Sequence, residues 1–308
     1  CNIGTVCAPA KPIQTRHDVL PLPKRLMRPF TRFACADWSG AKGSRHPGIA
    51  LAVCEAGNKA PRLVPAPSGI WSRQAVADWL LAQDDDLLIG FDFSFAPPMI
   101  ARGAYLPGDA LPTSAKPFWA YVDDICDDVD LGAASFLEKH HRRHFYFGAA
   151  DGVKSTFLHW RQCELLNKNS SGKISTVFDA IGASQVAKAS FAGMRFLNHV
   201  RDHVAIWPFD PLPERGPVVV EIYTTIAARA AGVAKGRSKI RDASGLDDAL
   251  SALDSLPHTP LERYTDHATD ALLTAAWLRK TASNPQFWTP TALNCEIAAT
   301  EGWTFGII

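Results

Sequence analysis

The chain has 308 residues, of which 47% are hydrophobic and 20% charged, and its formal net charge is +1. These values are typical of a soluble globular protein. They exclude a protein that binds nucleic acid through bulk positive charge, so any such binding must use a local patch. No apolar run is long enough to span a membrane. The seven cysteines form no CxxC pair, which indicates reduced thiols in a cytoplasmic protein.

The first 30 residues are rich in proline and basic residues, and we expect them to form an extended arm. Because the chain begins with cysteine and not methionine, the presence of an upstream segment or of a removed leader stays an open question. Residues 33–37 form a short apolar stretch that predicts a buried strand ending in Asp37. A turn with several glycines follows, and residues 49–54 predict a second strand, so the two strands form a hairpin. A carboxylate buried in such a place is costly unless it is paired or bound to a metal.

The next elements continue an α/β pattern. A short strand is expected around residues 62–64, and Ser72 is a good N-cap for a helix over residues 73–83. Residues 87–94 are again apolar, with Asp92 near their end. The order is therefore strand, strand, strand, helix, strand, with one acid at the end of the first strand and one at the end of the fourth.

Residues 99–216 interrupt this pattern, and we interpret them as an insertion. They include a basic and aromatic run at residues 139–146, and they predict a helix at 194–203 and a short strand at 206–210. The run mixes cations with aromatic rings as a single-strand binder would. Amphipathic packing explains it as well or better.

The core pattern resumes with an apolar strand at residues 217–223 that carries Glu221. A helix over residues 224–231 should end at Gly232. A second helix is expected at residues 246–256. The last strong element is an Ala/Leu-rich helix that begins near Thr265 or Asp266.

Acids inside strands of this apolarity are hard to explain as solvent-facing residues. At the start of the last helix, His267 and Asp270 share a face with Asp266. If these acids met the strand acids with nothing between them, their charges would repel and raise one another's pKa. A hard divalent cation such as Mg²⁺ or Mn²⁺ removes that difficulty, and carboxylates are its preferred ligands. Two such ions could activate a water and stabilise the leaving oxygen of a phosphodiester.

Each of these residues also has a simpler interpretation. Asp37 could cap the turn that follows it, and Asp92 could cap the loop after its strand. Glu221 could pair with a buried arginine. For Asp266 the role of helix N-cap is favoured, and His267 could be an exposed polar residue.

Several short motifs together resemble one family. They are Asp37-Trp38-Ser39-Gly40, Gly90-Phe91-Asp92-Phe93-Ser94, Glu221-Ile222-Tyr223-Thr224, Asp266-x-x-x-Asp270-Ala271-Leu272 and Glu301-Gly302-Trp303-Thr304-Phe305-Gly306. The family is uncharacterised, and its members are labelled as predicted nucleases with a ribonuclease H-like fold. The resemblance covers roughly residues 33–97 and 217–308. In addition, His267-x-x-Asp270 is similar to the final helix of RuvC-type junction resolvases.

The resemblance implies a ribonuclease H-like mixed sheet flanked by helices, with a core at residues 31–98 and 217–308 and a partly helical insertion subdomain at 99–216. It also implies a metal-dependent nuclease that acts on nucleic acid or a nucleotide-like substrate. The predicted catalytic residues are Asp37, Asp92, Glu221, Asp270 and His267. The predicted ligands of Mg²⁺ or Mn²⁺ are Asp37, Glu221, Asp270 and Asp266, and the predicted phosphate-binding residues are Lys42, Lys235, Lys239 and Arg241.

Two other functions remain open. Sugar kinases and actin-like ATPases share this type of core, but they need glycine-rich phosphate loops and a duplicated core, and the sequence shows neither. A non-catalytic module that binds nucleic acid or a nucleotide is the second alternative. The near-neutral charge favours that module, or a small nucleotide-like substrate, over a nuclease of long duplexes.

Overall fold

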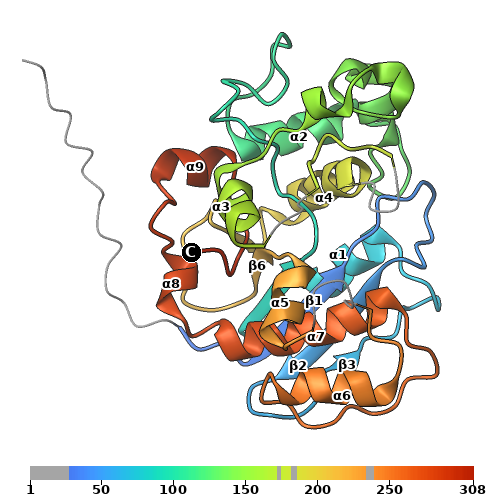
Figure 1. The fold of residues 1–308 in the computed structure, drawn as a ribbon, viewed down its shortest axis with the longest axis vertical. Helices are drawn as coiled ribbons and strands as arrows, with labels where there is room; N and C mark the ends of the chain where they lie inside the picture. Colours follow the sequence, from blue (N-terminus) through green and yellow to red (C-terminus); the bar gives the residue numbers. More distant parts are fainter. Residues whose placement is uncertain (1–27, 172–174, 182–185, 234–238) are drawn as a thin grey trace, which may run out of the picture.

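A mixed sheet of six strands lies at the centre of the protein and is flanked by helices (Figure 1). The structure is a computed structural model that describes residues 28–171, 175–181, 186–233 and 239–308. The predicted arm at residues 1–30 therefore lies almost entirely outside the described residues. The strands are β1 (Arg32–Asp37), β2 (Ala50–Glu55), β3 (Arg62–Leu63), β4 (Leu87–Phe91), β5 (Ala205–Trp207) and β6 (Val218–Glu221).

The strand order in the sheet is β3-β2-β1-β4-β6-β5. Strands β1, β4, β6 and β5 run parallel to one another, whereas β2 is antiparallel to both β1 and β3. The predicted hairpin is thus confirmed, with Asp37 opposite Ala50. Since β1 and β4 are parallel neighbours, Asp37 and Asp92 come to the same edge of the sheet.

The α-helices are α1 (Arg73–Leu81), α2 (Ala115–Ile125), α3 (Gln162–Ser171), α4 (Val186–Val200), α5 (Thr224–Ala230), α6 (Ala243–Ser251), α7 (Asp266–Thr281), α8 (Pro285–Trp288) and α9 (Cys295–Thr300). Four short turns of other helix types are η1 (Phe136–His140), η2 (Arg142–His144), η3 (Ala149–Asp151) and η4 (Lys154–Phe157). None of the helices within the described ranges is long and apolar enough to cross a membrane.

The two faces of the sheet support two separate hydrophobic clusters. In β1, Phe33 and Cys35 belong to the cluster that contains α7, whereas Ala34 and Ala36 belong to the cluster that contains α1, α2 and α4. This alternation follows from the two-residue period of a strand. Figure 1 shows α2, α3 and α4 gathered together, with α5, α6 and α7 below them. We call these the insertion face and the α7 face.

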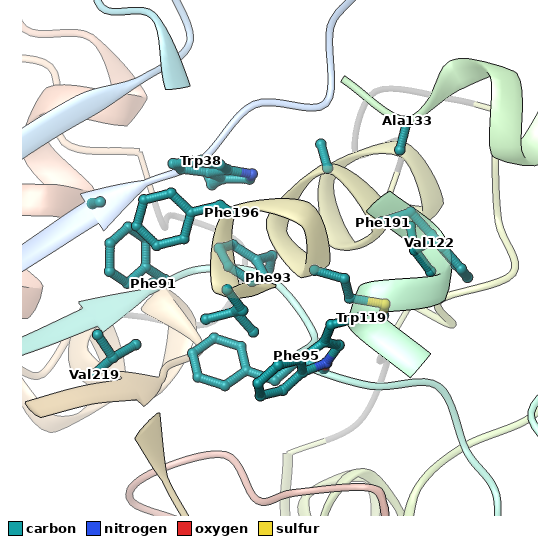
Figure 2. Close-up of a cluster of buried hydrophobic side chains, with 14 of the residues drawn as sticks. Trp38, Phe91, Phe93, Phe95, Trp119, Val122, Ala133, Phe191, Phe196 and Val219 are labelled. Carbon is teal, nitrogen blue, oxygen red and sulfur yellow. The ribbon is translucent and has the colours of Figure 1, made fainter. Parts of the chain in front are cut away.

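Aromatic side chains join the insertion to the core sheet (Figure 2). The ring of Phe196, from α4, lies 5.0 Å from the ring of Trp38 and 4.7 Å from that of Phe91. A Cβ at Gly193 would lie 2.3 Å from the ring of Phe93, so α4 approaches the sheet this closely only because that position is glycine. The insertion therefore shares its hydrophobic core with the sheet.

Three expectations need correction. Strand β5, which the sequence placed in the insertion, pairs with β6 and is the edge strand of the core sheet, so the insertion ends before Ala205. Phe30, assigned to the arm, is buried and stacks on Trp288 with ring centroids 5.9 Å apart. Helix α4 begins at Val186, earlier than the predicted residue 194.

Candidate functional site

A cavity of about 620 Å³ opens at the edge of the sheet where β1 and β4 end. Helix α7 bounds one side, and residues of α3 and α4 bound the other. Six residues predicted from the sequence line this one cavity, namely Asp37, Asp92, Glu221, Asp266, His267 and Asp270. The structure thus brings together acids that are up to 233 positions apart in the chain.

Asp37 and Asp92 occupy equivalent positions on neighbouring strands. The paired register aligns Ala36 with Phe91, and the next residue in each strand direction is the acid. The backbone N–H of Asp92 donates to the carbonyl of Ala36 at 3.3 Å, which continues the pairing. Because Phe33 and Cys35 contact the α7 face, the two-residue period directs Asp37 to that face as well.

The first turn of α7 supplies the other two groups. Thr265 caps the helix, with its side chain accepting from the backbone N–H of Ala268 at 3.2 Å. His267 and Asp270 are three positions apart and lie on one helical face. The Nδ1 atom of His267 lies 3.1 Å from Oδ1 of Asp37, and this contact joins α7 to the end of β1.

The electrostatics of these acids are unfavourable without a cation. Burial raises the pKa of Asp92 well above its usual range, and the charges of Asp37 and Asp270 raise it further. Burial also raises the pKa of Asp270, to about 7, with Asp37 adding to the effect. In the described part of the chain, no lysine or arginine forms an ion pair with Asp37, Asp92 or Asp270.

Asp37 and His267 form a polar pair at the mouth of the cavity. Burial raises the pKa of Asp37, although the hydrogen bond with His267 opposes this shift. The same hydrogen bond raises the pKa of His267, whose side chain is 46% exposed. Gly48 lies beside the ring, and a Cβ at this position would lie 3.4 Å from Nε2 of His267, an ordinary van der Waals contact.

The carboxylates of Asp37, Asp92 and Asp270 converge on one cavity without touching. They do not form a group whose ligand atoms all lie within 4.8 Å of one another; among the described residues such a group occurs elsewhere. The three side chains would have to move closer together to bind a single ion.

Glu221 differs from the other acids. In the register it pairs with Phe91, so it faces the insertion side, and Ile222 occupies the position level with Asp92. The guanidinium of Arg161 binds both carboxylate oxygens, and the backbone N–H of Phe95 and the hydroxyl of Thr304 donate to them as well. Glu221 therefore has the alternative role considered for it, as the partner of a buried arginine.

Asp266 also differs from its prediction. The N-cap of α7 is Thr265, so the expectation that Asp266 caps the helix is wrong. Instead Asp266 pairs with Lys239 at 2.5 Å and with Arg241. Burial opposes the shift, but the hydrogen bonds from these two cations lower the pKa of Asp266 overall.

The predicted phosphate-binding residues fall in three places. Lys239 and Arg241 are held beside the cavity by Asp266 and are largely exposed. Lys42 is exposed and pairs with Glu138 of the insertion at 2.7 Å. Lys235 lies outside the described residues.

Three buried residues that were not predicted, Arg161, Glu164 and Glu301, form a polar network next to Glu221. Arg161 is fully buried and binds Glu164 at 2.9 Å as well as Glu221. Glu301 accepts backbone N–H groups from Met99 at 2.7 Å and Ile100 at 2.8 Å, and a third from residue 162 at 3.0 Å. Glu301 stands in a motif quoted above, but no signal in the sequence pointed to Arg161 or Glu164.

Comparison of the chain with protein-family models, with curated proteins and with solved structures gives no match. The functional argument therefore depends on the geometry of the cavity.

Proposed function

We propose that the protein is a metal-dependent phosphodiester hydrolase, with Asp37, Asp92 and Asp270 as the ligands of Mg²⁺ or Mn²⁺. One observation carries the proposal: three carboxylates, of which Asp37 is buried and Asp92 and Asp270 are partly buried, line one cavity, and no lysine or arginine in the described ranges forms an ion pair with them. Buried charges are otherwise paired. A hard divalent cation satisfies this set, because carboxylate oxygens are its preferred ligands.

The fold supports the same proposal. Three strands in an antiparallel meander are followed by α1 and then by the parallel strands β4 and β6, and the long helix α7 packs back on β1 and β2. This is the order expected of a ribonuclease H-like core, and we propose that class for the sheet. Because fold alone does not fix function, the carboxylates carry the argument.

The chain's own groups suit the hydrolysis of a phosphate ester. Oδ1 of Asp37 bonds His267, which leaves Oδ2 for a cation. His267 is held in orientation by that bond, and its exposed ring can take or give a proton at Nε2. When bound, a divalent cation supplies Lewis-acid stabilisation of the phosphoryl group and of the attacking water. Lys239 and Arg241, beside the cavity, are placed to neutralise a further phosphate.

The decisive test is a cleavage assay with the full chain in Mg²⁺ or Mn²⁺. The substrates are single-stranded, duplex and branched nucleic acids, and a small phosphodiester such as a dinucleotide. We expect cleavage that is lost on chelation. The cleavage rate of Asp37→Asn and of Asp270→Asn should fall by at least about 100-fold, because mutating even the residues that hold metal ligands in place lowers metal affinity or activity by 10–100-fold.

The matched control is Asp254→Asn. Asp254 is 77% exposed, lies after α6 and has a positive φ of 58°, which asparagine tolerates. This variant should cleave like the wild type. Turnover of ATP that requires an acceptor sugar would replace the proposal with a phosphotransferase. Binding of nucleic acid or nucleotide with no turnover in either metal would instead identify a binding module, and both results contradict the proposal.

A further inference from the structure

Two histidines and an aspartate meet in the insertion, away from the candidate active site. Oδ2 of Asp109 lies 2.9 Å from Nδ1 of His141 and 2.8 Å from Nε2 of His144. Within the described ranges, these three residues are the group whose ligand atoms all lie within 4.8 Å of one another. None of them lines the cavity described above. Both histidines belong to the basic and aromatic run at residues 139–146.

Local structure places the two rings on the same side of the chain. His144 ends the 3₁₀ helix η2, and His141 immediately precedes it. Side chains three positions apart eclipse one another in a 3₁₀ helix, so both rings can face Asp109. The side chains of His141 and His144 are only 8% and 9% exposed, and that of Asp109 is 21% exposed.

Contacts with Tyr121 and Phe136 fix the position of the His141 ring. Its second nitrogen, Nε2, lies 2.9 Å from the hydroxyl of Tyr121 on α2. Its ring also packs against Phe136, with centroids 4.5 Å apart. Histidines that bind metals are oriented by such a hydrogen bond at the nitrogen that does not bind the ion. The nitrogen that faces Asp109 is the one left for a ligand role.

Hydrogen bonding alone does not satisfy His144. Its Nε2 atom must carry a hydrogen to donate to Asp109, yet Nε–H of Arg143 points at the same nitrogen from 3.1 Å and requires a lone pair there. One nitrogen cannot meet both demands. Arg143 also pairs with Oδ1 of Asp109. The guanidinium of Arg143 thus lies where a metal cation would contact both Asp109 and His144. The Arg143 side chain is 63% exposed, so it can rotate into solvent when an ion binds.

We propose that Asp109, His141 and His144 form a binding site for a zinc-class ion. Two imidazoles and a carboxylate suit Zn²⁺ and Co²⁺ rather than Mg²⁺. Zn²⁺ binds such ligands at about 2.0–2.1 Å in a tetrahedron, which sets neighbouring ligand atoms about 3.3 Å apart. The two contacts of Asp109, at 2.8–2.9 Å, therefore need to widen by about 0.4 Å, and the two histidine nitrogens lie within 4.8 Å of one another. Water completes the fourth position.

The site has a structural consequence for the insertion. Residues 99–114 contain no helix or strand, and Asp109 lies in this stretch. An ion on the three residues fastens this long loop to the segment that contains η1 and η2. Long loops without regular structure usually require such a fixed point or a function of their own. The proposal does not depend on the proposed hydrolase activity.

The test uses the full chain, stripped of metal by chelation and then titrated with Zn²⁺ or Co²⁺. The background is the double variant Asp37→Asn/Asp270→Asn, which removes binding at the candidate active site. We expect one ion per chain, visible absorption bands of tetrahedral Co²⁺, and a rise in Tm of about 4 °C or more at a 100-fold excess over Kd.

Three variants of neighbouring residues separate a metal site from simple packing. In His144→Ala the Co²⁺ bands and the rise in Tm should be lost. In Arg143→Ala binding should become tighter, because the competing guanidinium is gone. The matched control His140→Ala, at an exposed position, should bind like the parent. Unchanged Co²⁺ spectra in His144→Ala, or weaker binding in Arg143→Ala, would overturn the proposal, as would the absence of binding in the parent.

Discussion

Two sets of acids lie at the same edge of the sheet, on opposite faces, and their partners differ. On the insertion face, Glu221 and Glu164 share the guanidinium of Arg161. On the α7 face, Asp37, Asp92 and Asp270 have no lysine or arginine in contact within the described ranges, and Asp37 has only His267. In the first set, the protein itself supplies a cation that contacts both carboxylates.

The contrast shows that a one-residue difference in strand position decides which face of the sheet an acid occupies. Glu221 pairs with Phe91 in the register, while the level of Asp92 on β6 is occupied by Ile222. Because side chains alternate between faces, this one-residue offset sends Glu221 to Arg161 and leaves Asp92 facing α7. Charge that the fold does not compensate marks the place where a ligand is expected.

The largest expected effect comes from removing the compensation on the insertion face. Arg161→Met leaves Glu221 and Glu164 buried without a cation, and this should lower the free energy of unfolding by about 3–5 kcal/mol. Chemical denaturation measures it. Arg241→Met, at a half-exposed position, is the control and should cost less than about 1 kcal/mol. A second change, Glu221→Gln, should restore part of the loss in the Arg161→Met chain; no recovery would mean that the ion pair does not explain the burial.

An intermediate effect is expected from pH on the α7 face. The folded-state pKa of Asp270 is raised to about 7, so between about pH 4 and pH 7 the folded state holds more protons than the unfolded state. Stability contributed by this group therefore falls as pH rises through that interval. Divalent cations need the deprotonated carboxylate, so the increase in Tm caused by Mn²⁺ should grow as pH rises toward 7.

The matching control replaces the titrating group. In Asp270→Asn the increase in Tm caused by Mn²⁺ should be small and should vary little over the same pH interval. Thermal unfolding with and without Mn²⁺ at each pH provides the comparison. A wild-type response to Mn²⁺ that is equally large at pH 5 and pH 8 would show that Asp270 does not bind the ion.

The smallest effect is expected at Asp266, which the sequence proposed as a ligand and the structure pairs with surface cations. Asp266→Asn should change the free energy of unfolding by less than about 1 kcal/mol, since exposed ion pairs contribute little. It should also leave the affinity for Mn²⁺ within a few-fold of the wild type, as measured by calorimetry. A loss of Mn²⁺ binding as large as that in Asp37→Asn would return Asp266 to the metal-binding set.

Local patterns predicted much of this molecule. The apolar runs at residues 33–37 and 49–54 and the cap at Ser72 predicted β1, β2 and the start of α1. Gly232, with a φ of 77°, ends α5 in the predicted place. Acids at strand ends and in the first turn of α7 pointed to one edge of the sheet, and the cavity there contains them.

Long-range pairing limited the prediction of the site. The face that Glu221 occupies depends on the register of β6 against β4, which no local signal sets. Its partner Arg161 lies 60 positions earlier, in a segment without a recognisable motif. Likewise β5 has only three residues, too few to show that it pairs with the core sheet. Contacts between segments far apart in the chain determine the face of Glu221, its pairing with Arg161 and the position of β5 in the sheet.

The position of Glu301 has a consequence for biosynthesis. Its carboxylate accepts N–H groups at both ends of the segment between β4 and α3, from Met99, Ile100 and Gln162. A nascent polypeptide that has left the ribosome only as far as α6 contains Asp37 and Asp92, but it lacks α7 and this anchor. All three carboxylates are therefore present only after translation has passed Asp270, and the anchor at Glu301 is added later still.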